Sequence, residues 1–218
     1  MSAPPYWLVN VDPGLHSAEC PEYLLNVDEN DKANLGTLDA DFNILTWPSV
    51  QEIVSTNRID KFRRLHSELR RYLEYTWKLK QRYGSVMRFI VEERLKWPTV
   101  QPESPVPFAS PNDYFILFND WPYGLVKSIV HLVVWTKFPF EDDVQTGDMT
   151  AKTRSMIDDF VAGTFHPHVP PENVLWFRNW ASLKSIHAVE HFHVMLNDAD
   201  PVFVREITSG DVPLVARV

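Results

Sequence analysis

The clearest pattern of apolar and polar positions lies in the first half of the chain, between residues 59 and 83. Apolar residues recur there at steps of three and four, and charged residues fill the positions between them. This period predicts one amphipathic helix, with an apolar face toward a core and a charged face, including Arg64, toward solvent. Gly84 follows directly and is predicted to end the helix.

Two shorter helices flank this one in the predicted pattern. Ser49, with Glu52 three residues later, has the arrangement of a helix N-cap and its capping-box partner. A second helix is predicted over 85–97 from its apolar positions, and Pro98 stops it. Residues 46–97 are therefore expected to form a helical extension.

The pattern changes after a proline-rich stretch. Residues 98–113 hold five prolines and are predicted to be a linker or an ordered arm. Beyond them, short apolar runs rich in β-branched and aromatic residues predict strands, and one amphipathic run predicts a helix at 149–165. The predicted strands are 114–118, 128–137, 173–179, 185–196 and 201–207.

The order of these elements predicts an α+β protein. Helices come first, followed by a strand–strand–helix–strand–strand block, and this order favours an antiparallel sheet with helices on one side. We expect residues 1–45 to form an irregular N-terminal arm and residues 114–208 to form the α+β core. Residues 46–208 are expected to make one compact unit, with a loose tail after it. The sequence carries no dinucleotide or P-loop motif, and we expect no cofactor.

Composition and charge limit the partners. The formal net charge of −8 argues against nucleic acid as the main partner, because binding to a phosphate backbone depends on Lys and Arg. No apolar run approaches the length of about 18 residues that suggests a membrane-spanning helix, and no secretory signal is visible. The single cysteine, Cys20, excludes an internal disulfide framework and fits a reducing compartment. These features predict a cytoplasmic protein with a small-molecule partner and no membrane partner.

Two histidines near the end of the chain are the strongest candidates for chemistry. His191 and His193 stand two apart on a predicted strand, so both face one side of the sheet, and His187 shares that side if the strand is unbroken. Buried imidazoles need hydrogen-bond partners, so one interpretation is a pair of structural histidines. A second is a nucleophile beside a group that holds phosphate. A third is a metal site, with further ligands from His187 or from the separate pair His166 and His168.

Two stretches around these histidines resemble histidine-triad proteins. In residues 118–137, an Asn-x-x-Pro segment leads to a strand with a histidine and a basic residue; in residues 174–196, an asparagine and a serine precede the histidine strand. The matching positions are Asn119, Pro122, His131, Lys137, Asn179, Ser185, His191 and His193. The resemblance implies a histidine-triad-like antiparallel sheet, with His191 as nucleophile and catalytic roles for His193 and His131. The sequence departs from the triad at Val189, which stands where the first histidine should be.

Short motifs of aromatic and basic residues lie along much of the chain. They are Arg82-Tyr83-Gly84-Ser85, Arg94-Leu95-x-Trp97, Asn119-Asp120-Trp121-Pro122-Tyr123, Trp135-Thr136-Lys137, Trp176-Phe177-x-Asn179-Trp180 and Glu190-His191-x-His193-Val194. On these motifs the chain resembles a fungal family of unknown function, typified by an N-acetylglucosamine-induced protein. The resemblance spans residues 40–200 and implies little about activity.

Together these features predict a small-molecule site near the histidines. Trp121, Trp180 and Tyr123 are expected to line a pocket, and Lys137 to contact an anion. Its polar residues would be His131, Asn179, Ser185, His191 and His193, with His187 beside them. We expect a hydrolase or transferase that acts at phosphorus on a small phosphorylated or anionic metabolite. An acid–base enzyme of fungal secondary metabolism (lyase, isomerase or cyclase type), a metal-binding protein and a non-catalytic metabolite-binding protein stay open, and the helical pair could form a homodimer face.

Overall fold

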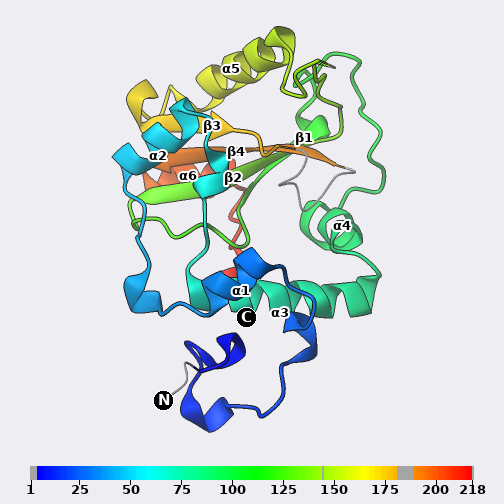
Figure 1. The fold of residues 1–218 in the computed structure, drawn as a ribbon. Coiled ribbons are helices and arrows are strands. Elements are labelled where there is room, and N and C mark those ends of the chain that lie inside the picture. Colours follow the sequence, from blue (N-terminus) through cyan, green and yellow to red (C-terminus); the bar gives the residue numbers. More distant parts are fainter. Residues whose placement is uncertain (1–3, 144, 181–188, 218) are drawn as a thin grey trace.

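A sheet of four antiparallel strands lies at the centre of the part of the chain that the computed structural model describes, residues 4–143, 145–180 and 189–217 (Figure 1). The strand order is β1-β2-β4-β3. The strands are β1 (Tyr114–Phe118), β2 (Ile129–Thr136), β3 (Val174–Phe177) and β4 (Glu190–Asn197). All pairs are antiparallel, which confirms the α+β class and the antiparallel sheet.

Helices cover both faces of this sheet (Figure 1). On one face, Phe192 and Val194 of β4 pack with α5 (Ala151–Phe165) and α6 (Pro201–Ile207). On the other, α2 (Trp47–Ser55), α3 (His66–Tyr83) and α4 (Val86–Phe89) contribute the apolar cover. The prediction of helices on one side is wrong because the central strands are buried on both faces, so each face needs apolar cover.

The helix predicted over 59–83 is observed only over His66–Tyr83, the C-terminal part of that range. Residues Ile59–Lys61 form a 3₁₀ turn, and α3 begins only at His66. Arg64 therefore lies in the segment before the helix rather than on its solvent face. The end agrees with the prediction: Gly84 caps α3 in the left-handed region with φ of 78°.

Each of the two predicted flanking helices differs from expectation at one end. The first begins earlier than Ser49 predicts, and the second, predicted to continue to residue 97, ends at Leu95. The helix α2 begins at Trp47 with Thr46 as N-cap and Pro48 in its first turn, so Ser49 is not the N-cap. Ser85 caps α4, its hydroxyl accepting from the Arg88 N–H. After α4 the chain continues as a π-helical stretch, Ile90–Leu95.

The predicted last strand, 201–207, is the helix α6. Asp200 caps it by accepting the Val202 N–H, and Pro201 occupies the first turn. The tail that follows is attached rather than loose: Leu214 is buried, and its N–H donates to the Asp120 carboxylate over 3.0 Å. The C-terminal segment thus packs against the loop after β1.

The remaining segments pack on this framework. In the stretch 98–113, the buried carboxylate of Asp113 accepts two backbone N–H groups, and Phe108 stacks on Phe160 of α5 with ring centroids 4.0 Å apart; the stretch is an ordered arm. Near the N-terminus, α1 (Glu29–Leu35) packs on α3 (Figure 1). Within the described ranges, the other 3₁₀ turns are Tyr6–Leu8, Pro13–Leu15, Glu22–Leu24, Asp39–Asp41, Pro111–Asp113, Pro171–Asn173 and Leu214–Ala216. No helix in the described part of the chain has both the length and the apolar character to cross a membrane.

Candidate functional site

A cavity of about 190 Å³ lies between the histidine-bearing face of the sheet and the helices α3 and α4. His191 and His193 of β4 both line it and are almost fully buried. Two sequence-predicted neighbours, Trp121 and Tyr123, line it as well. The period of two in β4 places both histidines on this face, while Phe192 between them faces the core on the other side.

A buried polar chain runs beside the cavity. The Nε2 atom of His131, on β2, lies 3.0 Å from Nδ1 of His193. The Nε2 atom of His193 lies 3.1 Å from the side-chain nitrogen of Asn179, and the amide nitrogen of Asn119 lies 3.2 Å from Nε2 of His131. Both imidazoles thus have the partners that buried rings require.

His131 and His193 are both held in the neutral form. Burial lowers the pKa of His131 to about 3, and the positive charge of Arg64 adds to the effect. Burial also lowers the pKa of His193 well below its ordinary value, with smaller contributions from His131, His191 and Arg64. At neutral pH the pair therefore acts as hydrogen-bonding groups rather than as cations.

His191 is oriented by a backbone carbonyl and an aromatic ring. Its Nδ1 lies 3.1 Å from the carbonyl oxygen of Val189, and a carbonyl can only accept, so in the neutral form of the ring the proton lies on Nδ1. The lone pair is then on Nε2. The ring stacks on Trp135, directly opposite on β2, with centroids 4.5 Å apart. The tautomer and the plane of the ring are both fixed by neighbours.

Arg64 is a cavity residue that the sequence interpretation missed. Its Nε donates to the carbonyl of Trp121 over 3.0 Å, and its guanidinium lies 4.0 Å from the ring centroid of Tyr72. Its assignment to a solvated helix face is wrong, because the chain is not helical at this position. No local sequence signal marks where α3 begins, so the position of Arg64 could not be read from the periodicity.

A second arginine of the lining, Arg94, is neutralised by two carboxylates. It bonds Asp120 with Nε and Nη2, at 2.9 and 2.8 Å, and Asp211 with Nη1 and Nη2, at 2.8 and 2.9 Å. The side chains of Arg94 and Asp211 are almost fully buried. This cluster joins the π-helical stretch, the loop after β1 and the C-terminal segment at one end of the cavity.

Of the other residues predicted to bind a ligand, Asn179 lines the cavity, whereas Lys137 and Trp180 lie outside it. Asn179 lines the cavity and contacts His193. Lys137 lies over the ring of Trp97, 5.4 Å from its centroid, and does not reach the cavity. Trp180 also lies outside it: it is 37% exposed and donates to the side chain of Asn57. The predictions for Ser185 and His187 concern residues 181–188, which lie outside the described residues.

The structure does not bring the two histidine pairs together. His166 and His168 follow α5, and the ring of His168 stacks on Phe203 with centroids 4.3 Å apart. Phe203 belongs to the core on the sheet face opposite the cavity. Among the described residues, no group of three or more His, Cys, Asp or Glu is placed to hold a metal ion.

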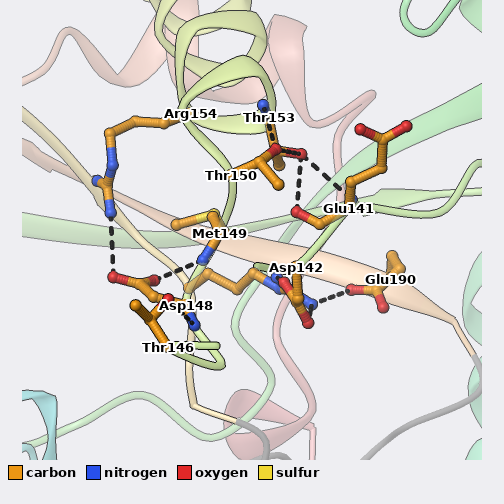
Figure 2. A network of polar contacts seen from close by, with 10 residues as sticks. Glu141, Asp142, Thr146, Asp148, Met149, Thr150, Thr153, Arg154 and Glu190 are labelled. Carbon is orange, nitrogen blue, oxygen red and sulfur yellow. Dashed lines mark hydrogen bonds and ion pairs between the residues drawn. The ribbon is translucent and has the colours of Figure 1, made fainter. Parts of the chain in front are cut away.

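Next to the site, an ion-pair network links β3 and β4 to the loop before α5 (Figure 2). Arg178, directly before Asn179, pairs with Asp142 and lies 3.2 Å from a carboxylate oxygen of Glu190. Its side chain is only 7% exposed. Arg178 therefore has carboxylate partners within the protein. Its pair with Glu190 joins the end of β3, next to Asn179, to the start of β4, next to His191.

The fold and the site define an α+β protein with a buried histidine pocket, and the sequence places it in a family. Residues 46–197 match the family model described as "Protein of unknown function (DUF3605)", and the chain belongs to this family.

Two fungal proteins are similar to the chain in sequence, and one solved structure is similar to it in fold. The chain is 28% identical over 186 residues to N-acetylglucosamine-induced protein 1 of Candida albicans, covering 76% of this chain and 73% of that protein. It is 25% identical over 156 residues to the uncharacterized protein YPL067C of Saccharomyces cerevisiae, covering 69% and 77%. A crystal structure titled HTC1 shares the fold, with a TM-score of 0.61 and 22% identity over 77% of this chain and 97% of that one. The resemblance to the fungal family is confirmed, and none of these descriptions names an activity.

Proposed function

We propose that this protein is a histidine-triad-like enzyme that acts on a small phosphorylated or otherwise anionic metabolite, by hydrolysis or transfer at phosphorus, with His191 as the nucleophile. The supporting observation is the contact between Nδ1 of His191 and the carbonyl oxygen of Val189, at 3.1 Å. A neutral imidazole with its proton on Nδ1 presents a nucleophilic lone pair on Nε2.

The missing triad histidine is compatible with this proposal. Val189 stands at its position, but the group that orients His191 is the backbone carbonyl, which every residue has. The Val189 side chain is buried in the apolar cluster with Leu79 and Trp135. Replacement of a histidine by valine therefore leaves the bond to the nucleophile unchanged.

The proposed reaction has two steps at phosphorus. In the first, Nε2 of His191 attacks, an N–P bond forms, and the bond from phosphorus to the leaving group breaks as that group takes up a proton from solvent. The Nδ1–H donated to Val189 stabilises the positive charge that develops on the ring. In the second, water attacks phosphorus, the N–P bond breaks, and Nε2 recovers its lone pair while the water proton passes to solvent.

The other polar residues hold the phosphate and the histidine strand. Asn179 lines the cavity beside His191, and its side-chain amide would bind a phosphate oxygen. Both ring nitrogens of His193 contact protein groups, His131 and Asn179, so His193 would orient the Asn179 amide. His131 lies behind His193 and contacts it without lining the cavity. We assign it a positioning role, as the group that fixes the ring of His193.

A comparison of His191→Gln with wild type tests this proposal. With nucleoside phosphoramidates and dinucleotides as substrates, we expect kcat to fall by a factor of 10³ or more, on the order of the loss of a covalent nucleophile. The exposed His166, on the other face of the sheet, provides the matched control His166→Gln, which should retain wild-type turnover. Turnover that survives in His191→Gln would remove the nucleophile assignment.

A second candidate function is acid–base catalysis on an unphosphorylated metabolite. It is favoured by the cavity wall, in which Tyr72, Tyr75, Trp121, Tyr123 and Trp135 all take part. Such a wall suits an apolar ring, and His191 in its neutral form would serve as the base. A bell-shaped pH dependence of kcat/KM on a substrate without phosphorus would support this alternative, whereas activity restricted to phosphorus compounds would exclude it.

A further inference from the structure

The geometry points to Arg64 as the residue that recognises an anionic group, carboxylate or phosphate, carried on a single planar ring that occupies the cavity. This inference rests on the proposed function for the location of the site, but it concerns binding rather than chemistry. Arg64 lies outside the histidine strands and outside both stretches that resemble histidine-triad proteins.

The charge balance of the lining is the first argument. Of the two arginines in it, Arg94 is matched by Asp120 and Asp211. Arg64, by contrast, has no ion-pair contact with a carboxylate in the described part of the chain, although the charge of Asp31 interacts with it without such a contact. A guanidinium in a partly enclosed cavity with no carboxylate in direct contact attracts an anion from solution.

The orientation of Arg64 is the second argument. The bond from its Nε to the Trp121 carbonyl and the contact with the Tyr72 ring fix the plane of the guanidinium. A planar guanidinium fixed in this way is pre-organised for carboxylate or phosphate oxygens, so less entropy is lost on binding. The guanidinium also lies 5.7 Å from the ring centroid of Tyr123, and the Tyr123 ring is 5.0 Å from that of His131, so Arg64 is on the histidine side of the cavity.

The size and walls of the cavity define the rest of the ligand. A cavity of about 150 Å³ is enough to bind benzene, and this one measures about 190 Å³. It therefore has room for one ring and a small anionic substituent. The ring would lie among Tyr75, Trp121 and Trp135, whose side chains present aromatic surface to the cavity.

Calorimetric titration with benzoate, phenyl phosphate and benzamide tests this inference. Benzamide has the size of benzoate without its charge, and the two anions separate carboxylate from phosphate recognition. Wild type should bind at least one of the anions about tenfold or more tighter than benzamide, the effect of a charge-assisted hydrogen bond. Arg64→Gln should lose that preference, and Arg64→Lys should keep part of it.

The neighbouring arginine supplies the control. Arg63 bonds the carbonyls of Asp60 and Phe62 and does not line the cavity, so Arg63→Gln should bind the probes as wild type does. Equal binding by Arg64→Gln and wild type would overturn the inference. Equal affinity of wild type for benzoate, phenyl phosphate and benzamide, or binding of none of the probes, would overturn it as well. Because benzoate contains no phosphorus, its binding is independent of whether His191 is a nucleophile, and the two proposals can fail separately.

Discussion

At the residue scale, the central feature is a pair of buried imidazoles in direct contact. His131 and His193 share one hydrogen bond of 3.0 Å between ring nitrogens. Only one proton can lie between two facing nitrogens, so protonation of both rings would place two N–H groups against each other in a buried site. The pocket is therefore built for the neutral forms of both residues.

The depressed pKa of His131 predicts an acid-sensitive fold. Its folded-state pKa is about 3, against an ordinary value of 6.5, so between these values the unfolded state binds the proton and the folded state does not. The contribution of this residue to the free energy of unfolding is therefore highest above pH 6.5 and decreases as the pH falls below that value. From pH 7 to pH 5 the free energy of unfolding should decrease by about 2 kcal/mol through this residue.

Urea titrations at the two pH values measure this loss. In His131→Gln, which has no titrating ring, the decrease in unfolding free energy should be smaller by that amount. The same pH dependence in wild type and variant would show that His131 is not held neutral by the fold.

Some site residues could be predicted from sequence and others could not. The placement of His191 and His193 on one face followed from the period of a strand, which is a local property. The placement of His131 in the same site, which depends on the pairing of β2 with β4, came only from the resemblance to a known family, since strand pairing is not local. Arg64 was missed because the apolar period continues through residues that are not helical.

At the element scale, the network around Arg178 joins three segments that the site depends on. Figure 2 shows Asp142 and Glu190 approaching the same side chain from the loop before α5 and from β4. Arg178 and Glu190 each directly precede a site residue, Asn179 and His191. The network therefore fixes the spacing of those two residues across the sheet.

Removal of this arginine should destabilise the fold. In Arg178→Met, Asp142 and Glu190, which are 44% and 21% exposed, lose the cation that they share, and the free energy of unfolding should fall by about 1–2 kcal/mol. The matched control is Arg154→Met, because the pair of Arg154 with Asp148 is 3.7 Å long and about half exposed; its loss should cost less than about 1 kcal/mol. Chemical denaturation of both variants measures the difference, and equal losses would contradict the structural role of the network.

Helices and strands, like site residues, could be predicted where the signal is local to the segment. The run of apolar residues at Tyr114–Phe118 predicted β1 at its observed bounds. In α6 the β-branched and aromatic residues suggested a strand, but Asp200 and Pro201 give the N-cap and first turn of a helix. The apolar pattern there is also helical, since Phe203 and Val204 are buried while Val202 is exposed.

At the scale of the whole molecule, the cavity is enclosed by segments from distant parts of the chain. The family match ends at residue 197, yet Leu214 lines the cavity and is held there by its bond to Asp120. Arg94, from the helical half, bonds the loop after β1 and the C-terminal segment at once. Because such contacts depend on the complete fold, the attachment of the tail could not be predicted from its sequence.

The most direct test of the account is the intact mass of the protein during turnover of a nucleoside phosphoramidate, measured at alkaline pH to preserve an N–P bond. We predict a nucleotidyl adduct on wild type and on His166→Gln, located by fragmentation on His191, and no adduct on His191→Gln. An unmodified wild-type protein, or an adduct that persists in His191→Gln, would contradict the assignment of His191 as the nucleophile.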